Sequence, residues 1–444
     1  MSDPLRGVIL EGNCGVAPIS LGEKTLRKAR IRIIPFIFLL YFVAYLDRTN
    51  IAFAALTMNK ELGVTSQQFG LLSGIFFFGY FIFEVPSNLL LHKIGARIWI
   101  ARILITWGTV AAVTGLVRTV HQLYFARFLL GFAEAGYLPG IILYLTYWFR
   151  RQERAQVTAL FLTGLPVTAI LGAPITALIL DHVHWLGVSS WRWLLVLEGI
   201  PAIVCGILTY VVLPSSPHEA RFLARDEKEW IREQLELEEQ EKLKQHQYSI
   251  FQTLTNRRVW LLISIYFGMM FGSYTLNFWL PQLVQSLSTT YSNTTVGFLV
   301  MIPNLVGLGA MIAVSRSSDQ RLERRLHAAI PAVIGAVAFL LLTTAHSPFY
   351  SITLLSVLAA GIYAFLGPFW ALPSEFLTGF AAAAGLALIN SVGNLGGFVG
   401  PFTVGVIKQR TASLHGGFIL AGIAMLLSAT LMLLVREKTQ NSAA

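Results

Sequence analysis

The sequence contains little cysteine and little charge. Its 444 residues include only two cysteines, Cys14 and Cys205, and charged side chains make up 13% of the chain. One cysteine stands in the N-terminal tail and the other within an apolar run, which excludes a disulfide framework and a cysteine metal cluster. With so few charges and a mean hydropathy of +0.64, the chain is also too apolar to be a soluble globular protein.

Long apolar runs are what the chain has in abundance. Each covers roughly 18 residues or more, enough for an α-helix to cross a hydrocarbon core about 30 Å thick. Lipid offers the backbone no hydrogen-bond partners, so spanning segments are helices or strands of closed barrels, and barrel strands are only about ten residues long. The sequence therefore predicts an all-α polytopic membrane protein.

Twelve transmembrane helices are predicted, in two six-helix bundles. They cover 33–56, 68–91, 98–117, 123–148, 157–180 and 193–213 in the first half, and 259–284, 295–314, 328–345, 349–372, 383–406 and 417–435 in the second. The predicted domains are an N-terminal tail at 1–30, a bundle at 31–213, a linker with an amphipathic helix at 214–258, a bundle at 259–435 and a C-terminal tail at 436–444.

The basic residues, 33 Lys and Arg against 23 Asp and Glu, are concentrated in alternate loops. The loops that we assign to the cytoplasm carry Arg150, Arg151, Arg154, Arg316, Arg321, Arg324, Arg325, Arg436 and Lys438. Such an excess marks cytoplasmic loops, so we expect both termini in the cytoplasm and a multi-pass protein of the plasma membrane, such as a bacterial inner membrane. This topology explains the net charge of +10 without nucleic acid, and we expect no cleaved signal peptide.

A charged residue inside a predicted span costs roughly 2.5–3.5 kcal/mol on insertion scales, so Asp47 and Arg48 in the first span and Arg127 and Glu134 in the fourth mark a candidate site. Arg127 and Glu134 are seven residues apart and project within about 20° of one helix face, whereas Asp47 and Arg48 diverge by about 100°. We therefore expect Asp47 to pair with Arg127, and Arg48 to face a central cavity beside Tyr45. Glu134 would then be the less well paired acid, able to take up a proton near neutrality.

The second half has almost no charges within its spans but offers neutral polar and aromatic side chains. We therefore assign proton coupling to Asp47 and Glu134 in the first half, and substrate orientation mainly to the second. The candidate substrate-binding residues are Arg48, Arg127, Tyr45, Tyr80, Tyr274, Asn277, Trp370, Asn390 and Asn394. Glu84 and Glu198 stand near span ends, and we interpret them as partners of loop bases. No metal site or cofactor is expected, the proton being the coupling ion.

Two loops at equivalent positions of the halves resemble each other. Residues 88–97 and 315–324 fit one template, a small residue followed by an acid, a base, a glycine and a second base. Each copy departs from it, with His92 in place of the acid in the first and Leu322 in place of the glycine in the second. Matching loops in two halves are typical of parallel-repeat transporters. The candidate gating residues are Asn88, Gly95, Arg97, Ser315, Arg316, Asp319 and Arg324.

Six segments carry a family resemblance that covers almost the whole chain outside the tails and the linker. They are Tyr45-Leu-Asp47-Arg48-Thr-Asn50-Ile, Phe83-Glu84-Val-Pro86-Ser87-Asn88-Leu, Gly95-Ala-Arg97-Ile-Trp99-Ile-Ala-Arg102, Glu134-Ala-Gly-Tyr-Leu-Pro139-Gly140, Ser315-Arg-Ser-Ser-Asp319 and Glu323-Arg-Arg. Together they resemble the major facilitator superfamily and, more narrowly, its anion:cation symporter family.

The resemblance implies a major facilitator fold, a monomer in the lipid bilayer, and proton-coupled uptake of a small organic anion such as a sugar acid, tartrate or an aromatic carboxylate. It implies that Asp47 and Glu134 take part in proton coupling. It also implies that Arg48 and Arg127 associate with these acids and with the substrate carboxylate, and that Asn394 contacts substrate.

Two other functions stay open. A proton-coupled exporter of drugs or metabolites shares the fold, although Gly164-Leu165-Pro166 is a poor match to the Gly-Pro-rich antiporter motif. A transporter-like sensor or an intramembrane enzyme is disfavoured because the chain has no nucleophile or metal motif, so we expect no enzyme. Among anions, the shortage of polar side chains around Thr163 disfavours a polyhydroxylated sugar acid relative to tartrate-like and aromatic carboxylates.

Overall fold

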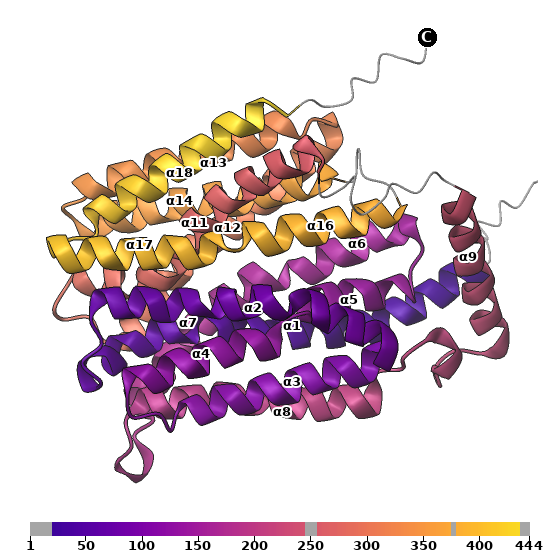
Figure 1. Ribbon diagram of the computed structural model, residues 1–444, viewed down its shortest axis with the longest axis horizontal. Coiled ribbons are helices and arrows are strands. Elements are labelled where there is room, and N and C mark those ends of the chain that lie inside the picture. Colours follow the sequence, from indigo (N-terminus) through magenta and orange to yellow (C-terminus); the bar gives the residue numbers. More distant parts are fainter. Residues whose placement is uncertain (1–19, 245–254, 374–378, 436–444) are drawn as a thin grey trace, which may run out of the picture.

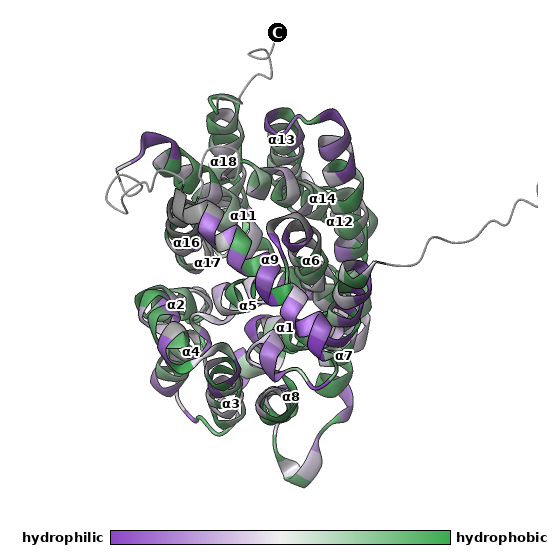
Figure 2. Cartoon of the chain, turned by 90° about the vertical axis from the view of Figure 1, so that its right-hand side faces the viewer, coloured by the Kyte–Doolittle hydropathy of each residue, from purple (hydrophilic) through white to green (hydrophobic). Residues whose placement is uncertain are grey.

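The computed structural model describes residues 20–244, 255–373 and 379–435. Every regular element in these ranges is a helix, and most of the helices run side by side along the long axis of the molecule (Figure 1). Seen end on, most helices of the first half form one group and those of the second half another, and the two groups lie against each other (Figure 2). The prediction of an all-α chain is confirmed.

In the part of the first half that the structure describes, up to the linker, there are eight α-helices. They are α1 (Leu21–Glu61), α2 (Ser66–Ile94), α3 (Ala96–Thr114), α4 (Val120–Glu134), α5 (Tyr137–Thr146), α6 (Arg151–Leu162), α7 (Gly164–His182) and α8 (Ser190–Val212). The second half contributes α11 (Arg257–Ser286), α12 (Asn293–Arg321), α13 (Arg325–Leu341), α14 (Pro348–Ala371), α16 (Gly379–Gly393), α17 (Gly396–Thr411) and α18 (His415–Leu433).

Within the described ranges, eleven helical segments are long and apolar enough to cross a membrane. The predicted span 383–406 is not among them because it is divided between α16 and α17, which have 15 and 16 residues. These two helices follow one another along a single line (Figure 1). The span around 123–148 is also interrupted, between α4 and α5, where Gly136 takes a φ of +83° that other residues rarely adopt.

The basic segment before the first predicted span is helical as well. α1 begins at Leu21, and Ser20 and Glu23 form a capping box at its N-terminus, so the helix starts twelve residues before the predicted position 33. The linker helix α9 (Arg225–Lys244) lies across this end of the molecule (Figure 2). Lys28 of α1 donates to Glu227 of α9 at 2.7 Å, and Arg154 pairs with Glu238 at 3.1 Å, which holds the linker against the first bundle.

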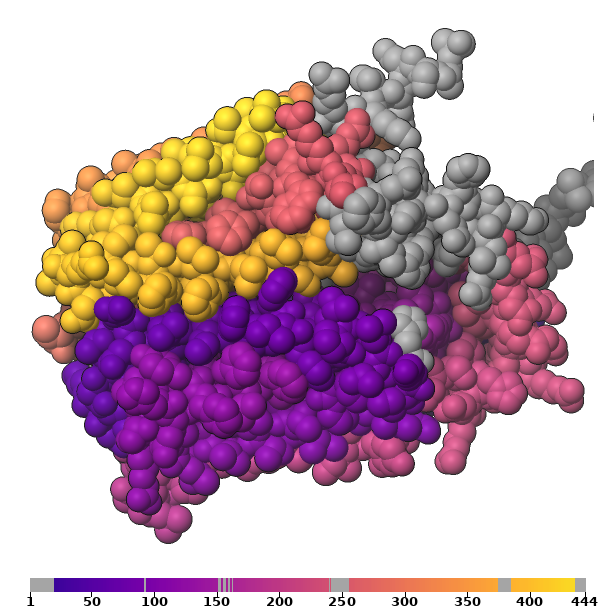
Figure 3. Space-filling model, viewed as in Figure 1, coloured from indigo at the N-terminus to yellow at the C-terminus, as the bar shows by residue number. Residues whose placement is uncertain are grey.

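The two bundles approach most closely at the end opposite α9. A Cβ atom at Gly70 of α2 would lie 2.5 Å from the carbonyl oxygen of Pro401 in α17, and one at Gly297 of α12 would lie 2.5 Å from the Ala177 side chain in α7. Small residues allow such close helix contact in membranes. The space-filling view shows α17 directly against α2 along this end (Figure 3).

Candidate functional site

Asp47 and Asn50 occupy a buried face of α1, from which Asp47 reaches a side chain of α3. Asp47 is 1% exposed, and its carboxylate accepts hydrogen bonds from Trp107 Nε1 at 2.7 Å and from Asn50 Nδ2 at 3.4 Å. It forms no ion pair with Arg127, so the predicted pairing of these two residues is wrong. Helix geometry established that Asp47 and Arg48 point in different directions, but it could not show that α3 would supply an indole donor to Asp47.

Arg48 forms the ion pair of this site, and its partner is Glu134 at the end of α4. The Arg48 Cζ atom lies 5.3 Å from the centre of the Phe76 ring and 5.5 Å from that of the Tyr80 ring, both of α2. Glu134 is 1% exposed. The interpretation of Glu134 as the poorly paired acid is therefore wrong, because the cation expected to face away from it reaches across from α1.

Arg127 of α4 is a buried cation without a carboxylate partner in the described part of the chain. It is 2% exposed, its Nη2 donates to the Arg48 carbonyl oxygen at 3.4 Å, and its Nε has no hydrogen-bond partner. Its Cζ atom lies 5.3 Å from the centre of the Phe76 ring. A buried guanidinium with unsatisfied donors is unstable unless an acceptor or an anion reaches it, so this residue is a candidate anion contact.

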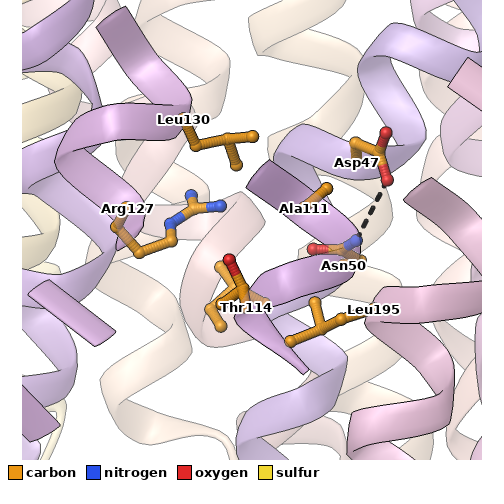
Figure 4. Close-up of a pocket in the computed structure, with 8 residues that line it drawn as sticks. Asp47, Asn50, Ala111, Thr114, Arg127, Leu130 and Leu195 are labelled. Atoms are coloured by element: carbon orange, nitrogen blue, oxygen red, sulfur yellow. Dashed lines mark hydrogen bonds between the residues drawn. The ribbon is translucent and has the colours of Figure 1, made fainter. Parts of the chain in front are cut away.

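A small cavity separates Arg127 from Asp47 between α1, α3, α4 and α8. Its lining residues are Asp47, Asn50, Ile51, Ala111, Thr114, Arg127, Leu130 and Leu195. Figure 4 shows the Arg127 guanidinium and the Asp47 carboxylate entering it from different helices, with Asn50 bonded to Asp47. The two residues therefore share one cavity without forming an ion pair.

Candidate residues of the second half lie across from Arg48. Tyr274 of α11 is 7% exposed, its ring centre lies 4.3 Å from that of Phe77 in α2, and its hydroxyl interacts with Arg48. Tyr45 is buried too, at 4% exposure, with its ring centre 6.3 Å from that of Tyr41. Arg48 therefore interacts with Tyr274 of the second bundle while it pairs with Glu134.

Asn277 and Trp370 are placed differently from these residues. Asn277 donates to the carbonyl of Ser273 in its own helix at 2.8 Å. Trp370 contacts Tyr266 at a ring-centre distance of 5.0 Å, and Tyr266 stacks on Phe369 at 5.3 Å, which forms an aromatic cluster beside α16. Neither Asn277 nor Trp370 forms a hydrogen bond or an ion pair with the charged residues of α1 and α4.

Asn390 and Asn394 are one turn apart on the second half's interrupted span. Asn394 Nδ2 donates to Asn390 Oδ1 at 3.0 Å, and Asn390 Nδ2 donates to Glu84 of α2 at 3.1 Å. Ser391 also donates to Glu84. The interpretation of Glu84 as a partner of loop bases is wrong, because this carboxyl group turns toward α16 of the other bundle.

Glu198 of α8 is likewise buried inside the molecule. It accepts from Thr176 Oγ1 at 2.6 Å, and Asn50 lies between it and Asp47. Its interpretation as a partner of loop bases is therefore also wrong. The signal that could have identified Glu84 and Glu198 is the one that identified Asp47, an acid within an apolar run.

The candidate gating loops differ from each other. In the first, Arg97 pairs with Glu219 of the linker at 3.4 Å, Gly95 ends α2 at a φ of +95°, and the Asn88 side chain lies beside Gly136. In the second, Asp319 pairs with Arg324, and the Arg324 Nη1 also donates to Ser318 at 3.0 Å.

Of the other second-loop candidates, Arg316 is exposed, and Ser315 stands where α12 crosses Gly367 of α14. The first loop is thus tied to the linker and the second to itself.

The family model described as Major Facilitator Superfamily matches residues 37–401. A putative tartrate transporter of Agrobacterium vitis is 44% identical over 95% of this chain and 97% of that protein. A quinolone resistance transporter of Acinetobacter baumannii is 36% identical over 94% of this chain and 98% of that protein.

Among solved structures, the inward open conformation of the xylose transporter XylE from E. coli superposes with a TM-score of 0.73, covering 93% of this chain and 97% of that one. At 15% identity, this likeness concerns the fold alone. It confirms the predicted major facilitator architecture.

Proposed function

Because this chain belongs to the Major Facilitator Superfamily and is a multi-pass membrane transporter, not an enzyme, we propose that it takes up a small organic anion together with protons. The first candidate substrate is a hydroxydicarboxylate of the tartrate type, because relatives that match the chain over nearly its whole length are named as putative tartrate transporters. We place it in the plasma membrane with both termini in the cytoplasm, in accord with the distribution of basic loops.

The buried Arg127 guanidinium, which has no carboxylate partner in the described ranges, is the feature that most favours anion transport. Asp47, Arg48, Arg127 and Glu134 sum to zero charge when both acids are ionised, yet only Arg48 and Glu134 are paired. In a low-dielectric interior an unbalanced charge is unstable, so an anion that binds Arg127 is favoured when an acid nearby takes up a proton. A proton on Asp47 leaves a net charge of +1, which one carboxylate neutralises. Anion binding and proton binding then favour each other, as linkage requires.

A second proton on Glu134 would release Arg48 toward the second bundle, where Tyr274 lies. Two protons would balance the two negative charges of a dicarboxylate such as tartrate. The arrangement thus supports a mechanism in which a substrate carboxylate takes the place of Glu134 beside Arg48. The second carboxylate of the substrate would then bind Arg127. Bidentate contacts of this kind suit arginine.

The conformation supports alternating access. Two hydrogen-bonded links join the bundles at the end opposite α9: Asp181 of α7 accepts from Asn293 Nδ2 and the Thr294 backbone N–H of α12, and Gln409 of α17 accepts from the Ser66 backbone N–H of α2. Each link caps the N-terminus of a helix with a side chain from the other bundle. We propose that this end is the closed outer gate and that the structure represents an inward-facing state.

The test is uptake of radiolabelled L-tartrate into proteoliposomes with an imposed pH gradient, acid outside. We expect accumulation above equilibrium that collapses with a protonophore, and competition by unlabelled dicarboxylates. Uptake that equilibrates without responding to the gradient would overturn proton coupling. If no carboxylate of a panel is taken up, the anion assignment fails as well.

Export of a drug is the second candidate function, favoured by the quinolone resistance transporter among the relatives. A quinolone combines a flat aromatic ring with a carboxylate, and the partly exposed Trp370, which packs on Tyr266 and Phe369, offers a ring for stacking. Energised inside-out vesicles that accumulate norfloxacin but not L-tartrate would favour export. The opposite selectivity would favour uptake of the anion.

A further inference from the structure

Glu84 of the first bundle is a buried carboxyl group that accepts hydrogen bonds from the second bundle. It is 1% exposed and lies in α2, about 15 Å along the helix from its end at Ile94. One carboxylate oxygen accepts from Asn390 Nδ2 at 3.1 Å and the other accepts from the Ser391 hydroxyl, both of α16. This link is separate from the Arg48–Glu134 pair and from the two links at the outer gate.

No cation forms an ion pair with Glu84 in the described ranges. The titratable or charged groups that act on it are Tyr80 of α2, Arg48 of α1 and Tyr266 of α11. Arg48 is already paired with Glu134. The charge of Glu84 is therefore stabilised mainly by two neutral donors of the opposite bundle, and any movement of α16 away from α2 removes both of them.

An ionised carboxylate can only accept hydrogen bonds, so it fixes how the neighbouring amide is oriented. Asn390 must turn its Nδ2 toward Glu84, which directs its Oδ1 toward Asn394. That oxygen then takes one of the two N–H groups of Asn394, at 3.0 Å. In this state the Oδ1 of Asn394 is left as an acceptor, which disfavours the approach of a substrate carboxylate.

Protonation of Glu84 would reverse the direction of the hydrogen bonds that join Glu84, Asn390 and Asn394. The new carboxylic O–H can donate to Asn390 Oδ1 after the Asn390 amide turns over, and Asn390 Nδ2 can then donate to Asn394 Oδ1. Both N–H groups of Asn394 become free to donate to an anion. The only bond formed is that between the incoming proton and a carboxylate oxygen of Glu84, and the remaining changes are exchanges of hydrogen bonds.

We infer that Glu84 is a third protonatable group of the transport cycle, a positioning residue that sets the hydrogen-bonding character of Asn394 through Asn390. The inference rests on the proposed proton-coupled anion transport and adds a site that joins proton binding to the contact between the bundles. Proton uptake at Glu84 favours anion binding at Asn394, and anion binding there favours the proton in return.

The first experiment measures L-tartrate binding to the purified protein across a range of pH. If Glu84 takes up a proton on binding, the slope of log Kd against pH becomes smaller by up to about one in Glu84→Gln, because one fewer proton is linked to binding. Glu84→Asp should keep the wild-type slope, whereas Asn390→Ala should show the same smaller slope as Glu84→Gln although its carboxyl group is intact. Glu227→Gln is the matched control, since it changes a buried carboxyl of the linker helix in the same way. A wild-type slope in Glu84→Gln would overturn the inference.

The second experiment needs no ligand. Infrared difference spectra between acid and alkaline pH report the carbonyl band of protonated carboxyl groups, and we expect one titrating band to be absent in Glu84→Gln and present in Glu227→Gln. If every titrating band of the wild type persists in Glu84→Gln, Glu84 does not take up a proton. Should the wild-type protein bind no dicarboxylate, the proposed function fails while these spectra still decide the protonation of Glu84.

Discussion

The outer gate offers a prediction whose size follows from the structure. Asp181 of α7 accepts from Asn293 Nδ2 at 2.7 Å and from the Thr294 backbone N–H at 2.6 Å, and both donors belong to the start of α12 in the other bundle. Asp181→Ala removes these bonds only from the conformation in which the outer ends meet. The substitution should therefore shift the equilibrium between conformations toward the outward-open state.

The magnitude can be worked from ordinary hydrogen-bond energies. An N-cap replaced by alanine costs about 0.5–2 kcal/mol, and a hydrogen bond to a charged group contributes about 1.5–3 kcal/mol. Water replaces part of this interaction once the gate opens, so we take about 2 kcal/mol for the pair of bonds. That value corresponds to a shift of roughly 30-fold in the ratio of outward-open to inward-facing molecules.

Distance measurement between spin labels is the assay. Leu186 and Phe349 are 88% and 84% exposed at the outer ends of the two bundles, so Leu186→Cys with Phe349→Cys provides labelling sites once Cys14 and Cys205 are replaced by serine. Asp181→Ala should increase the population at long distance. Glu61→Gln is the control, because Glu61 bonds to Trp191 within its own bundle. An unchanged distance distribution in Asp181→Ala, or an equal change in the control, would refute the reasoning.

Three further predictions concern the charged residues. Asp47→Asn and Glu134→Gln should each abolish accumulation of L-tartrate against its gradient, and normal accumulation in either variant would remove that residue from proton coupling. Arg48→Lys should raise the KM for uptake by ten-fold or more, since a single ammonium does not reproduce bidentate contact at about 1.5–3 kcal/mol; an unchanged KM would place the anion elsewhere. The third prediction concerns the pH dependence of stability at Glu323. Burial raises the pKa of the Glu323 carboxyl group, but hydrogen bonds from the Leu326 and His327 backbone N–H groups and from the His327 ring lower it more. The pKa therefore lies below its usual value. Its contribution is present above the unfolded pKa and lost as pH falls through the lower folded pKa, so the thermal-unfolding midpoints of wild type and Glu323→Gln should converge in acid; a constant difference would contradict it.

The sequence predicted the fold well because lipid restricts the choices. Apolar runs long enough to span a bilayer must be helices, and eleven spanning segments are found within the described ranges. The five glycines between 385 and 400 predict that the span 383–406 packs closely and bends, and the structure divides it into two helices. Glycine content indicates where a helix is weak, but it does not give the residue at which the helix ends.

The sequence indicates which residues form the candidate site more clearly than it indicates which of them interact with each other. An acid or base within an apolar run is visible in the sequence, which is why Asp47, Arg48, Arg127 and Glu134 could be selected. Helix periodicity fixes the angle between two side chains on one helix, but it does not say which neighbouring helix faces each of them. The partner of Asp47 proved to be an indole, Trp107, which carries no charge and so gives no signal in a search for ion pairs.

The positions of the helix breaks suggest how proton and substrate binding can be coupled to the movement of the bundles. α4 ends at Glu134, Gly136 takes a left-handed conformation, and α5 begins at Tyr137. Asn394 stands between the end of α16 and the start of α17. A break lets the two parts of a span tilt separately, so α5 and α16 can move while α4 and α17 stay packed in their bundles. Glu134 and Asn394 of the candidate site lie at these two joints, so we expect their positions to change when the bundles move.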